Sequence, residues 1–250
     1  MSIARRELEN YIGQLLVVER FRDYAPNGLQ VEGRERISRI VTGVTTSLAL
    51  VEAAIERDAD ALLVHHGWFW RGEDGCITGL RRRRLGTLIA NDINLFAYHL
   101  PLDAHPELGN NAQLGQVLGW QFDQRFGEQE LGCVAPVEFA DAPTLAHWVQ
   151  QRLGRGVTCV PGTPGRPIRR VAWCSGGAQG YFESAMAAGA DAFITGEISE
   201  PQAHLARECG VAFLAAGHHA TERYGAPAVA AHLAATLGLE HQFIDVDNPA

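Results

Sequence analysis

The stretch ISRIVTGVTTSLALVEAAIERDADALLVHH, residues 37–66, decides the fold, because its pattern returns as IRRVAWCSGGAQGYFESAMAAGADAFITGE at residues 168–197. The two stretches align without a gap at a shift of 131. The identical residues are Ile37, Arg39, Glu52, Ala54, Ala59, Asp60 and Ala61, which recur as Ile168, Arg170, Glu183, Ala185, Ala190, Asp191 and Ala192. Each stretch has a β-branched segment, an apolar helical stripe and a second apolar segment. This order is typical of strand–helix–strand units in a parallel or mixed sheet.

A second match follows at a shift of 119, where HLPLD (99–103) aligns with HHATE (218–222). The change in shift implies 131 − 119 = 12 extra residues in the first copy, within 67–84. The two matches together predict an internal duplication. We therefore expect an α/β protein with two halves related by a pseudo-dyad, so that polar strand ends from both halves meet near the axis.

Other segments have local signals for the ends of helices and strands. We expect a first helix at 4–18, strands at 36–45, 61–64 and 94–103 (ended by Pro101), and a strand-like segment at 131–139. Ser47 and Asp141 are expected to cap the helices that follow them, the second with Pro143 in its first turn. The Pro/Gly-rich stretch VTCVPGTPGRP, 157–167, is the best linker candidate.

The composition is that of an ordinary globular protein. The 250 residues carry 21 Lys and Arg against 29 Asp and Glu, a formal charge of −8, so no dedicated nucleic-acid binding is expected. The five cysteines are odd in number and form no CxxC, which disfavours disulfides and thiolate zinc sites and favours a reducing compartment. Because neither a signal peptide nor an apolar run of about 18 residues is visible, we expect a cytoplasmic protein without a membrane span.

The residues suited to chemistry follow the expected strands. One strand of each copy ends in His65-His66 or in Gly196-Glu197, and the HxxxD/E segments follow the others. Ligands of α/β sheets bind at the carboxyl ends of strands. Neighbouring residues of a regular strand point to opposite faces, so adjacent histidines suit two neighbouring ions better than one.

Imidazole and carboxylate without thiolate suit Zn, Mn, Fe, Co or Ni. Three histidines and two carboxylates are more ligands than one tetrahedral site with an open position can use. Their number suits two ions that share a carboxylate. The alternative is that an isolated His-His pair or a single HxxxE belongs to an ordinary surface or core. Coincidence with the repeat positions favours a dinuclear metal site.

Three further motifs each leave two interpretations open. CSGGAQG, 174–180, is either a tight turn between strand and helix or a phosphate contact. Trp68, Phe69 and Trp70 are either core or interface residues, or a stacking wall for a planar base. The run Arg81–Arg84 is either a solvated helix face or partner contact, or a device for steering phosphate or nucleic acid.

The segments VHHGWFW, HLPLDAHPELGNNAQL, TGE and AGHHATER resemble the Ngg-interacting-factor-three-like family, also known as GTP cyclohydrolase type-two homologues, from residue 24 to residue 250. The resemblance implies two intertwined three-layer α/β halves, 1–125 and 126–250, with two divalent metal ions between them. The ligands it implies are His65, His66, Asp103, His218 and Glu222. It leaves His99 and Glu197 outside the ligand set, as candidates for supporting the ligands or for transferring protons. It also implies a toroidal homohexamer.

The resemblance favours a metal-dependent hydrolase that acts on a nucleotide-like or otherwise phosphorylated small molecule, with Glu222 bridging the ions. The alternative is a non-catalytic metal-binding scaffold or regulator that acts through protein partners. A third hypothesis is metal trafficking, which predicts weakly held, exchangeable ions. The sequence names neither the native metal nor the substrate, and it identifies no catalytic residue.

Overall fold

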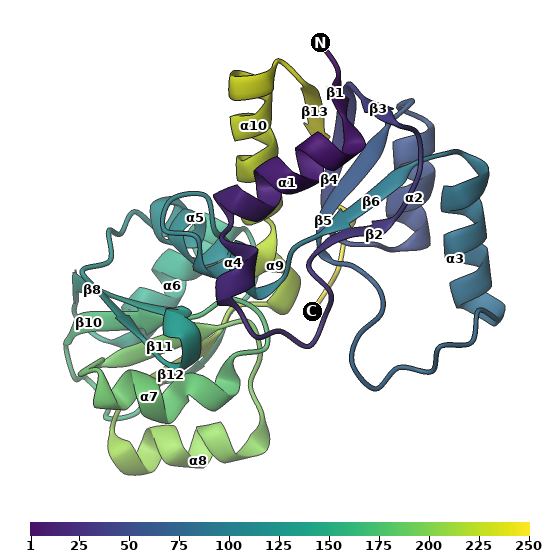
Figure 1. Cartoon of the computed structure of the whole chain (residues 1–250). Helices are drawn as coiled ribbons and strands as arrows, with labels where there is room; N and C mark the ends of the chain where they lie inside the picture. Colours follow the sequence, from purple (N-terminus) through teal and green to yellow (C-terminus); the bar gives the residue numbers. More distant parts are fainter. The chain divides into compact units, whose positions relative to one another are not determined.

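The computed structural model describes residues 1–250, which divide into two compact units (Figure 1). Unit 1 comprises Met1–Gly109 and Gly225–Asp247, and unit 2 comprises Asn110–Tyr224 and Asn248–Ala250. These bounds differ from a single division at 125/126. The chain leaves unit 1 after Gly109 and returns at Gly225, because residues 225–247 form a helix and a strand that pack on the sheet of unit 1.

Unit 1 is built on a five-stranded sheet in the order β13-β4-β5-β6-β2. Its strands are β2 (Gly28–Val31), β4 (Arg39–Thr45), β5 (Ala61–His66), β6 (Asn94–Ala97) and β13 (Glu240–Phe243). All neighbours are parallel except β2, which is antiparallel to β6. The short strands β1 (Ile3–Ala4) and β3 (Arg36–Ile37) pair separately. The sheet therefore has the mixed, mainly parallel order expected of strand–helix–strand units.

Helices cover both faces of this sheet (Figure 1). They are α1 (Arg5–Leu15), the 3-10 helix η1 (Val18–Arg20), α2 (Leu48–Ile55), α3 (Gly79–Ala90), α4 (Leu100–Ala104) and α10 (Gly225–Leu237). Successive strand residues face opposite ways, so Leu63 packs in one core with α1 and α10. Its neighbour Leu62 packs in the other core with α2 and α3. Unit 1 is thus a three-layer α/β structure, as expected.

Unit 2 is built on a six-stranded sheet in the order β7-β8-β10-β11-β12-β9. Its strands are β7 (Gln124–Phe126), β8 (Gly132–Phe139), β9 (Thr158–Val160), β10 (Ile168–Trp173), β11 (Ala192–Thr195) and β12 (Ala212–Ala215). Its helices are α5 (Asn110–Leu118), α6 (Ala142–Leu153), α7 (Phe182–Ala187), α8 (Glu200–Cys209) and α9 (His218–Glu222), with 3-10 turns η2 (Glu128–Glu130) and η3 (Gln179–Tyr181). The three central strands β10, β11 and β12 run parallel.

The sheet of unit 2 also has a core on each face. Trp173 of β10 packs with α5 and α6 on one face. On the other face, Phe193 and Phe213 pack with Phe182 of α7 at ring-centroid distances of 5.0 to 6.0 Å. The expected three-layer α/β organisation is therefore confirmed for each unit. No helix of the protein is both long enough and apolar enough to cross a bilayer.

Two cap predictions are confirmed, and several boundaries move. Ser47 accepts a hydrogen bond from the Leu50 amide (3.2 Å), and Asp141 accepts one from the Thr144 amide (2.9 Å). The first helix ends at Leu15 instead of residue 18, because Val17 has a left-handed φ of 50°. Pro101 was expected to end a strand. It lies instead in the first turn of α4, where its missing N–H leaves no bond unmade.

The linker predicted at 157–167 is wrong. Residues Thr158–Val160 form β9, which pairs antiparallel with β12 at the edge of the sheet of unit 2. The Pro/Gly-rich remainder is a turn inside the unit. Local composition indicated a flexible chain here, but pairing with a distant strand overrides that preference.

The strand–helix–strand repeat recurs in the hydrogen bonds. Asp60 accepts from the amides of Ser38 (2.7 Å) and Arg39 (2.9 Å) and pairs with Arg34. At the shift of 131, Asp191 accepts from the amides of Arg169 (2.9 Å) and Arg170 (3.0 Å). It pairs with Arg166. The aspartate joins the start of one strand to the start of the next in both units, which supports our inference of an internal duplication.

The second match, at a shift of 119, is one residue out of register with the strands. Ala61 pairs with Asn94 in unit 1, and Ala192 pairs with Ala212 in unit 2, so the strands are equivalent at 212 − 94 = 118. The next helices agree, since the Asp103 amide donates to the His99 carbonyl and the Thr221 amide donates to the Gly217 carbonyl. His99 thus corresponds to Gly217, and the expected equivalence of His99 with His218 is wrong.

Candidate metal centre

Unit 1 gathers its histidines where β5 and β6 end. The ring centroids of His65 and His66 lie 4.5 Å apart, and His99 lies 5.0 Å from the first and 5.9 Å from the second. One ligand atom of each residue lies within 4.8 Å of the others. Asp103 of α4 completes the group, with its Oδ1 3.5 Å from Nε2 of His65. These four residues are called the histidine cluster below.

The fold orients the rings of the histidine cluster through their Nδ1 atoms. His65 Nδ1–H donates to the Tyr98 carbonyl (3.1 Å), and His99 Nδ1–H donates to the Asp23 carboxylate (2.8 Å). His66 Nδ1 is 3.1 Å from the Thr45 hydroxyl. Because a neutral imidazole carries one proton, these acceptors fix Nε2 of His65 and His99 as the basic ring atom.

Asp23 is a buried acceptor that supports His99 and the start of α4. Its side chain is 4% exposed, and it accepts from the Leu100 amide and the Asn27 amide group, each at 2.9 Å, besides His99. Burial alone would raise the pKa of this carboxyl, but the hydrogen bonds from His99, Asn27 and the Leu100 amide lower it well below its usual range. Asp23 therefore stays ionised and fixes both His99 and the start of α4.

The aromatic segment that follows His66 divides between two environments. Trp68 packs against the core and donates its indole N–H to the Thr46 carbonyl (3.1 Å). Trp70 meets His99 edge-on at 5.0 Å and lies 6.5 Å from Tyr24. Phe69 has a left-handed φ of 68° and is 40% exposed. Trp68 is thus a packing residue, whereas Trp70 borders the histidine cluster.

Unit 2 contributes a histidine and two carboxylates. His218 and Glu222 lie on one face of α9, with Nε2 of His218 3.1 Å from Oε2 of Glu222. Glu197, at the end of β11, accepts from His218 Nδ1 at 2.6 Å. Burial would lower the pKa of His218, but the two carboxylates outweigh it and raise that pKa to about 9. The three residues form the His218 group, in which Nε2 again faces a carboxylate.

The turn CSGGAQG supports the His218 group, and three of its backbone amides donate hydrogen bonds to side chains of the protein. The amides of Ser175, Gly176 and Ala178 donate to side chains of Asn111, Thr221 and Thr195, respectively. Gly176 has a φ of 67°, and a Cβ there would collide with the Glu222 carboxylate. This environment favours the tight-turn interpretation over a phosphate contact.

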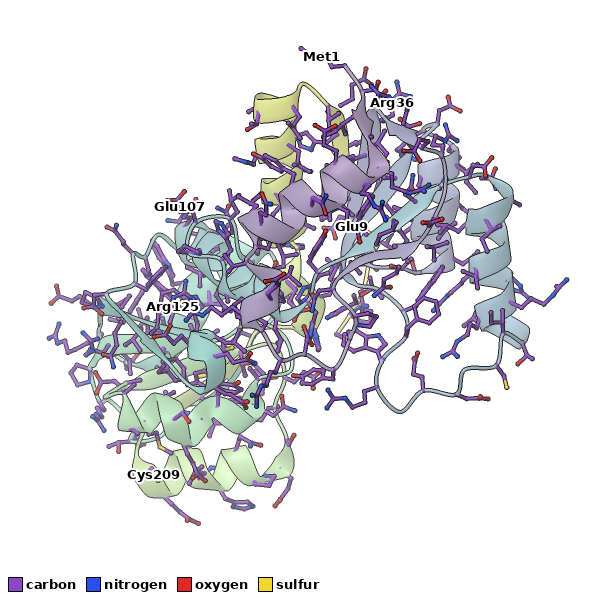
Figure 2. All side chains as sticks on the ribbon, in the orientation of Figure 1. Met1, Glu9, Arg36, Glu107, Arg125 and Cys209 are labelled. Atoms are coloured by element: carbon purple, nitrogen blue, oxygen red, sulfur yellow. The ribbon has the colours of Figure 1, made fainter.

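The arginine run and the cysteines stay outside both groups. Arg81–Arg84 belong to α3, where Arg82 and Arg83 are exposed and Arg81 pairs with Glu73 at 2.8 Å. This placement favours the solvated helix face. None of the five cysteines forms a disulfide, and Cys76 and Cys209 are exposed. Figure 2 labels Cys209, which ends α8.

Each unit brings its own predicted residues together: His65, His66 and Asp103 in unit 1, and His218 and Glu222 in unit 2. Sequence reasoning missed Asp23, Asn27 and Thr45, which support the histidines. Asp23 precedes the turn at Pro26 and Gly28 and lies 76 residues from His99, so no spacing rule links the two. Imidazole and carboxylate donors of this kind, buried or half-buried and oriented from behind, could hold a metal ion.

Comparison with known proteins identifies the family. The family model described as Duf34/NIF3 (NGG1p interacting factor 3) matches residues 3–249. The chain is 52% identical to a Pseudomonas aeruginosa protein named GTP cyclohydrolase 1 type 2 homolog, with all of both chains covered. An Escherichia coli K12 protein of the same name is 51% identical, with 98% of each chain covered. The solved structure of protein ybgI, of unknown function, has a TM-score of 0.95 at 49% identity and covers 99% of this chain and 100% of its own. The chain therefore belongs to the Duf34/NIF3 family, as its motifs predicted.

Proposed function

We propose that this chain is a di-metal-binding protein and a metal-dependent hydrolase of nucleotide-like or phosphorylated small molecules. In this proposal His65, His66 and Asp103 of unit 1 and His218 and Glu222 of unit 2 hold two divalent ions, with Glu222 shared between them. The observation that carries the proposal is the common orientation of the rings. His65 and His218 each donate Nδ1–H to a fixed acceptor and direct Nε2 towards a carboxylate.

This orientation fits a metal better than an ordinary buried histidine. Metal-ligating histidines regularly donate their other ring N–H to a carboxylate or backbone carbonyl, which fixes the tautomer and makes the ligating nitrogen more basic. The Tyr98 carbonyl and the Glu197 carboxylate supply these acceptors. Divalent ions held there would polarise a substrate oxygen and lower the pKa of water. Zn, Mn, Fe, Co and Ni all suit the donor set.

The surrounding residues have distinct tasks in this proposal. Glu197 orients His218, and its carboxylate is engaged at 2.6 Å. His99 is held by Asp23 beside the ligands without being one of them. The cyclohydrolase names of the relatives support a small-molecule substrate. The family resemblance supports a cytoplasmic location and a toroidal homohexamer, and light scattering of the purified protein would measure the number of subunits.

The test is a metal-reconstituted activity screen. Protein loaded separately with Zn, Mn, Fe, Co or Ni is assayed on nucleotides and simple phosphoesters, beside His65→Ala and Glu222→Gln variants. Turnover that requires both the metal and the two side chains is the expected result. Tight, stoichiometric metal binding without turnover on any compound would contradict the hydrolase proposal and favour a metal-binding scaffold that acts through partners. Activity of metal-free Glu222→Gln protein would contradict both.

A further inference from the structure

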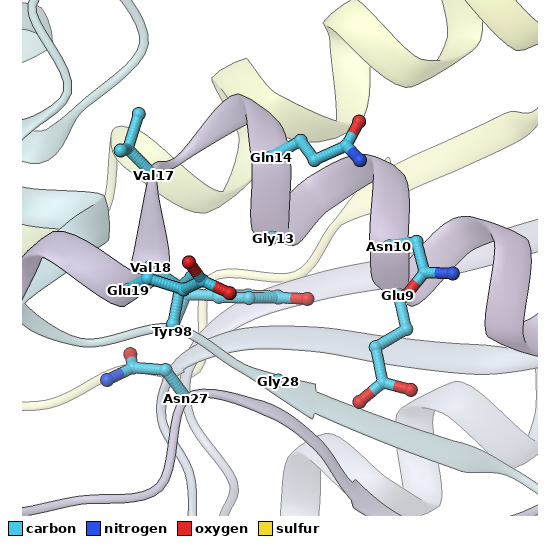
Figure 3. A pocket seen from close by; sticks show the side chains of 10 residues that line it. All are labelled: Glu9, Asn10, Gly13, Gln14, Val17, Val18, Glu19, Asn27, Gly28 and Tyr98. Atoms are coloured by element: carbon cyan, nitrogen blue, oxygen red, sulfur yellow. The ribbon is translucent and has the colours of Figure 1, made fainter.

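A pocket of about 630 Å³ lies in unit 1 outside the histidine cluster (Figure 3). One face of α1, the segment after α1, the start of β2 and the residue after β6 line it. Glu9 stands at one end and Glu19 towards the other, with the Tyr98 ring between them (Figure 3). Neither carboxylate takes part in the site proposed above.

Tyr98 is the unusual member of this lining. The residue is 1% exposed, and its buried hydroxyl has no hydrogen-bond partner in the protein. The hydroxyl points along the pocket towards the Glu9 end (Figure 3). Buried hydroxyls nearly always have a partner, and one without a partner points to a missing ligand.

The charges of the pocket define the ligand that it suits. Two carboxylates and the amide side chains of Asn10, Gln14 and Asn27 line it, and no Lys, Arg or His does. Glu9 accepts one hydrogen bond, from the Leu29 amide at 3.2 Å, and keeps further acceptor capacity on its carboxylate. An acidic lining with apolar stretches at Val17 and Val18 fits methylene groups between positive ends.

We propose that this pocket binds an aliphatic diamine or polyamine. One ammonium group lies between the Glu9 carboxylate and the Tyr98 hydroxyl oxygen, which accepts its hydrogen bond, and the next ammonium lies near Glu19. The Glu9 side chain, which is only partly buried, adjusts to admit the ammonium. This inference does not depend on the metal site or on its chemistry.

The same pocket lies directly behind the histidine cluster. Tyr98 presents its ring to the pocket and its carbonyl to His65, at 3.1 Å. Asn27 lines the pocket and accepts from the His99 amide at 2.7 Å. An occupant of the pocket therefore contacts two residues that also hold the histidines in place.

Isothermal titration calorimetry with putrescine and spermidine tests the proposal, with butanediol as the uncharged probe. The full-length protein is expected to bind the amines saturably and butanediol not at all, with and without zinc. Glu9→Gln should weaken amine binding by roughly tenfold or more, about 1.4 kcal/mol. Glu7→Gln is the matched control, because it removes the same charge from an exposed position of α1 outside this pocket.

Tyr98→Phe separates a binding role from a structural one. Removing a hydroxyl that has no partner should leave the melting temperature unchanged or raise it, while amine affinity falls. Equal affinities of the Glu9→Gln and Glu7→Gln proteins would overturn the proposal, since they indicate general attraction to a chain of charge −8. Absence of saturable binding would overturn it as well. So would a Tyr98→Phe protein with a lower melting temperature and unchanged affinity.

Discussion

The segment from β6 to α4 in unit 1 and the segment from β12 to α9 in unit 2 have equivalent strand pairing and helix starts, but they carry different chemistry. Both strands pair with an equivalent neighbour, and both helices begin with the same amide-to-carbonyl bond. Yet His99 precedes its helix and turns to Asp23, whereas His218 begins its helix and faces Glu222. The histidine lies one residue later relative to the helix start in unit 2 than in unit 1, and its imidazole therefore meets a different carboxylate.

The packing of unit 2 explains why it differs. Gly217 occupies the position of His99, with a φ of 101°, and a Cβ there would collide with the Arg155 side chain. Thr221 occupies the position of Asp103 and accepts from the Gly176 amide at 2.9 Å. The left-handed φ disfavours a side chain at residue 217, and the histidine of unit 2 comes one residue later. Repeated strand pairing does not by itself imply repeated ligands.

The largest expected effect compares His218→Ala with His99→Ala. Removing a residue that hydrogen-bonds to a metal ligand typically lowers metal affinity by about 10- to 100-fold, and removing the ligand itself lowers it further. We expect His218→Ala to reduce zinc affinity by more than about 100-fold. His99→Ala should keep full zinc stoichiometry, measured by mass spectrometry of dialysed protein. Equal losses would break the comparison, because the two histidines would then have equivalent roles.

The next largest effect is expected on stability, at the turn CSGGAQG that supports the His218 group. Gly176→Ala should destabilise the metal-free protein by about 2 kcal/mol, from the left-handed φ and the collision with Glu222. Gly177→Ala is the control, since its Cβ would make an ordinary 3.5 Å contact with His218. Its expected cost is below about 0.5 kcal/mol. Urea unfolding measures both, and equal destabilisation would refute the assigned role of Gly176.

The shared part of the two units is tested by Asp60→Asn and Asp191→Asn. Each substitution weakens two hydrogen bonds from strand amides and one ion pair. We expect each variant to lose about 2 kcal/mol, with similar values in the two units. Urea unfolding of the two variants gives the comparison. A large effect in one unit and none in the other would contradict their equivalence.

The smallest effect is the acid dependence contributed by Asp23. Its folded-state pKa lies below the unfolded value of about 3.9, so its stabilising contribution is present above that pH. The contribution is lost as the pH falls further towards the folded-state pKa. The difference in unfolding free energy between the unsubstituted protein and Asp23→Asn should therefore shrink below about pH 4. A constant difference from pH 5 to about pH 2.5 would contradict the low pKa.

Much of the fold followed from local signals in the chain. The repeat at 37–66 and 168–197 predicted the central strands and helices, and Ser47 and Asp141 capped the helices that they were expected to cap. The predictions failed where a distant segment decides the outcome. The stretch 157–167 has the composition of a linker, but β12 recruits part of it as a strand.

The candidate site shows the same division. The sequence placed His65, His66 and the residues of α9 at strand ends, and it omitted Asp23, Asn27 and Thr45. These polar residues lie in ordinary turn or strand contexts, and only folding brings Asp23 within 2.8 Å of His99 across 76 positions. Their supporting role depends on that approach, which no local pattern encodes.

The sequence by itself determined the family, the mixed α/β layers, the caps and the identities of the histidines and carboxylates. The tertiary structure decided the register between the two copies, the Nδ1 partners of the rings and the pocket beneath α1. The physical reason is that apolar alternation and residue type act within a few neighbouring residues. Register and ring orientation are set instead by hydrogen bonds between strands and side chains that are far apart in the chain.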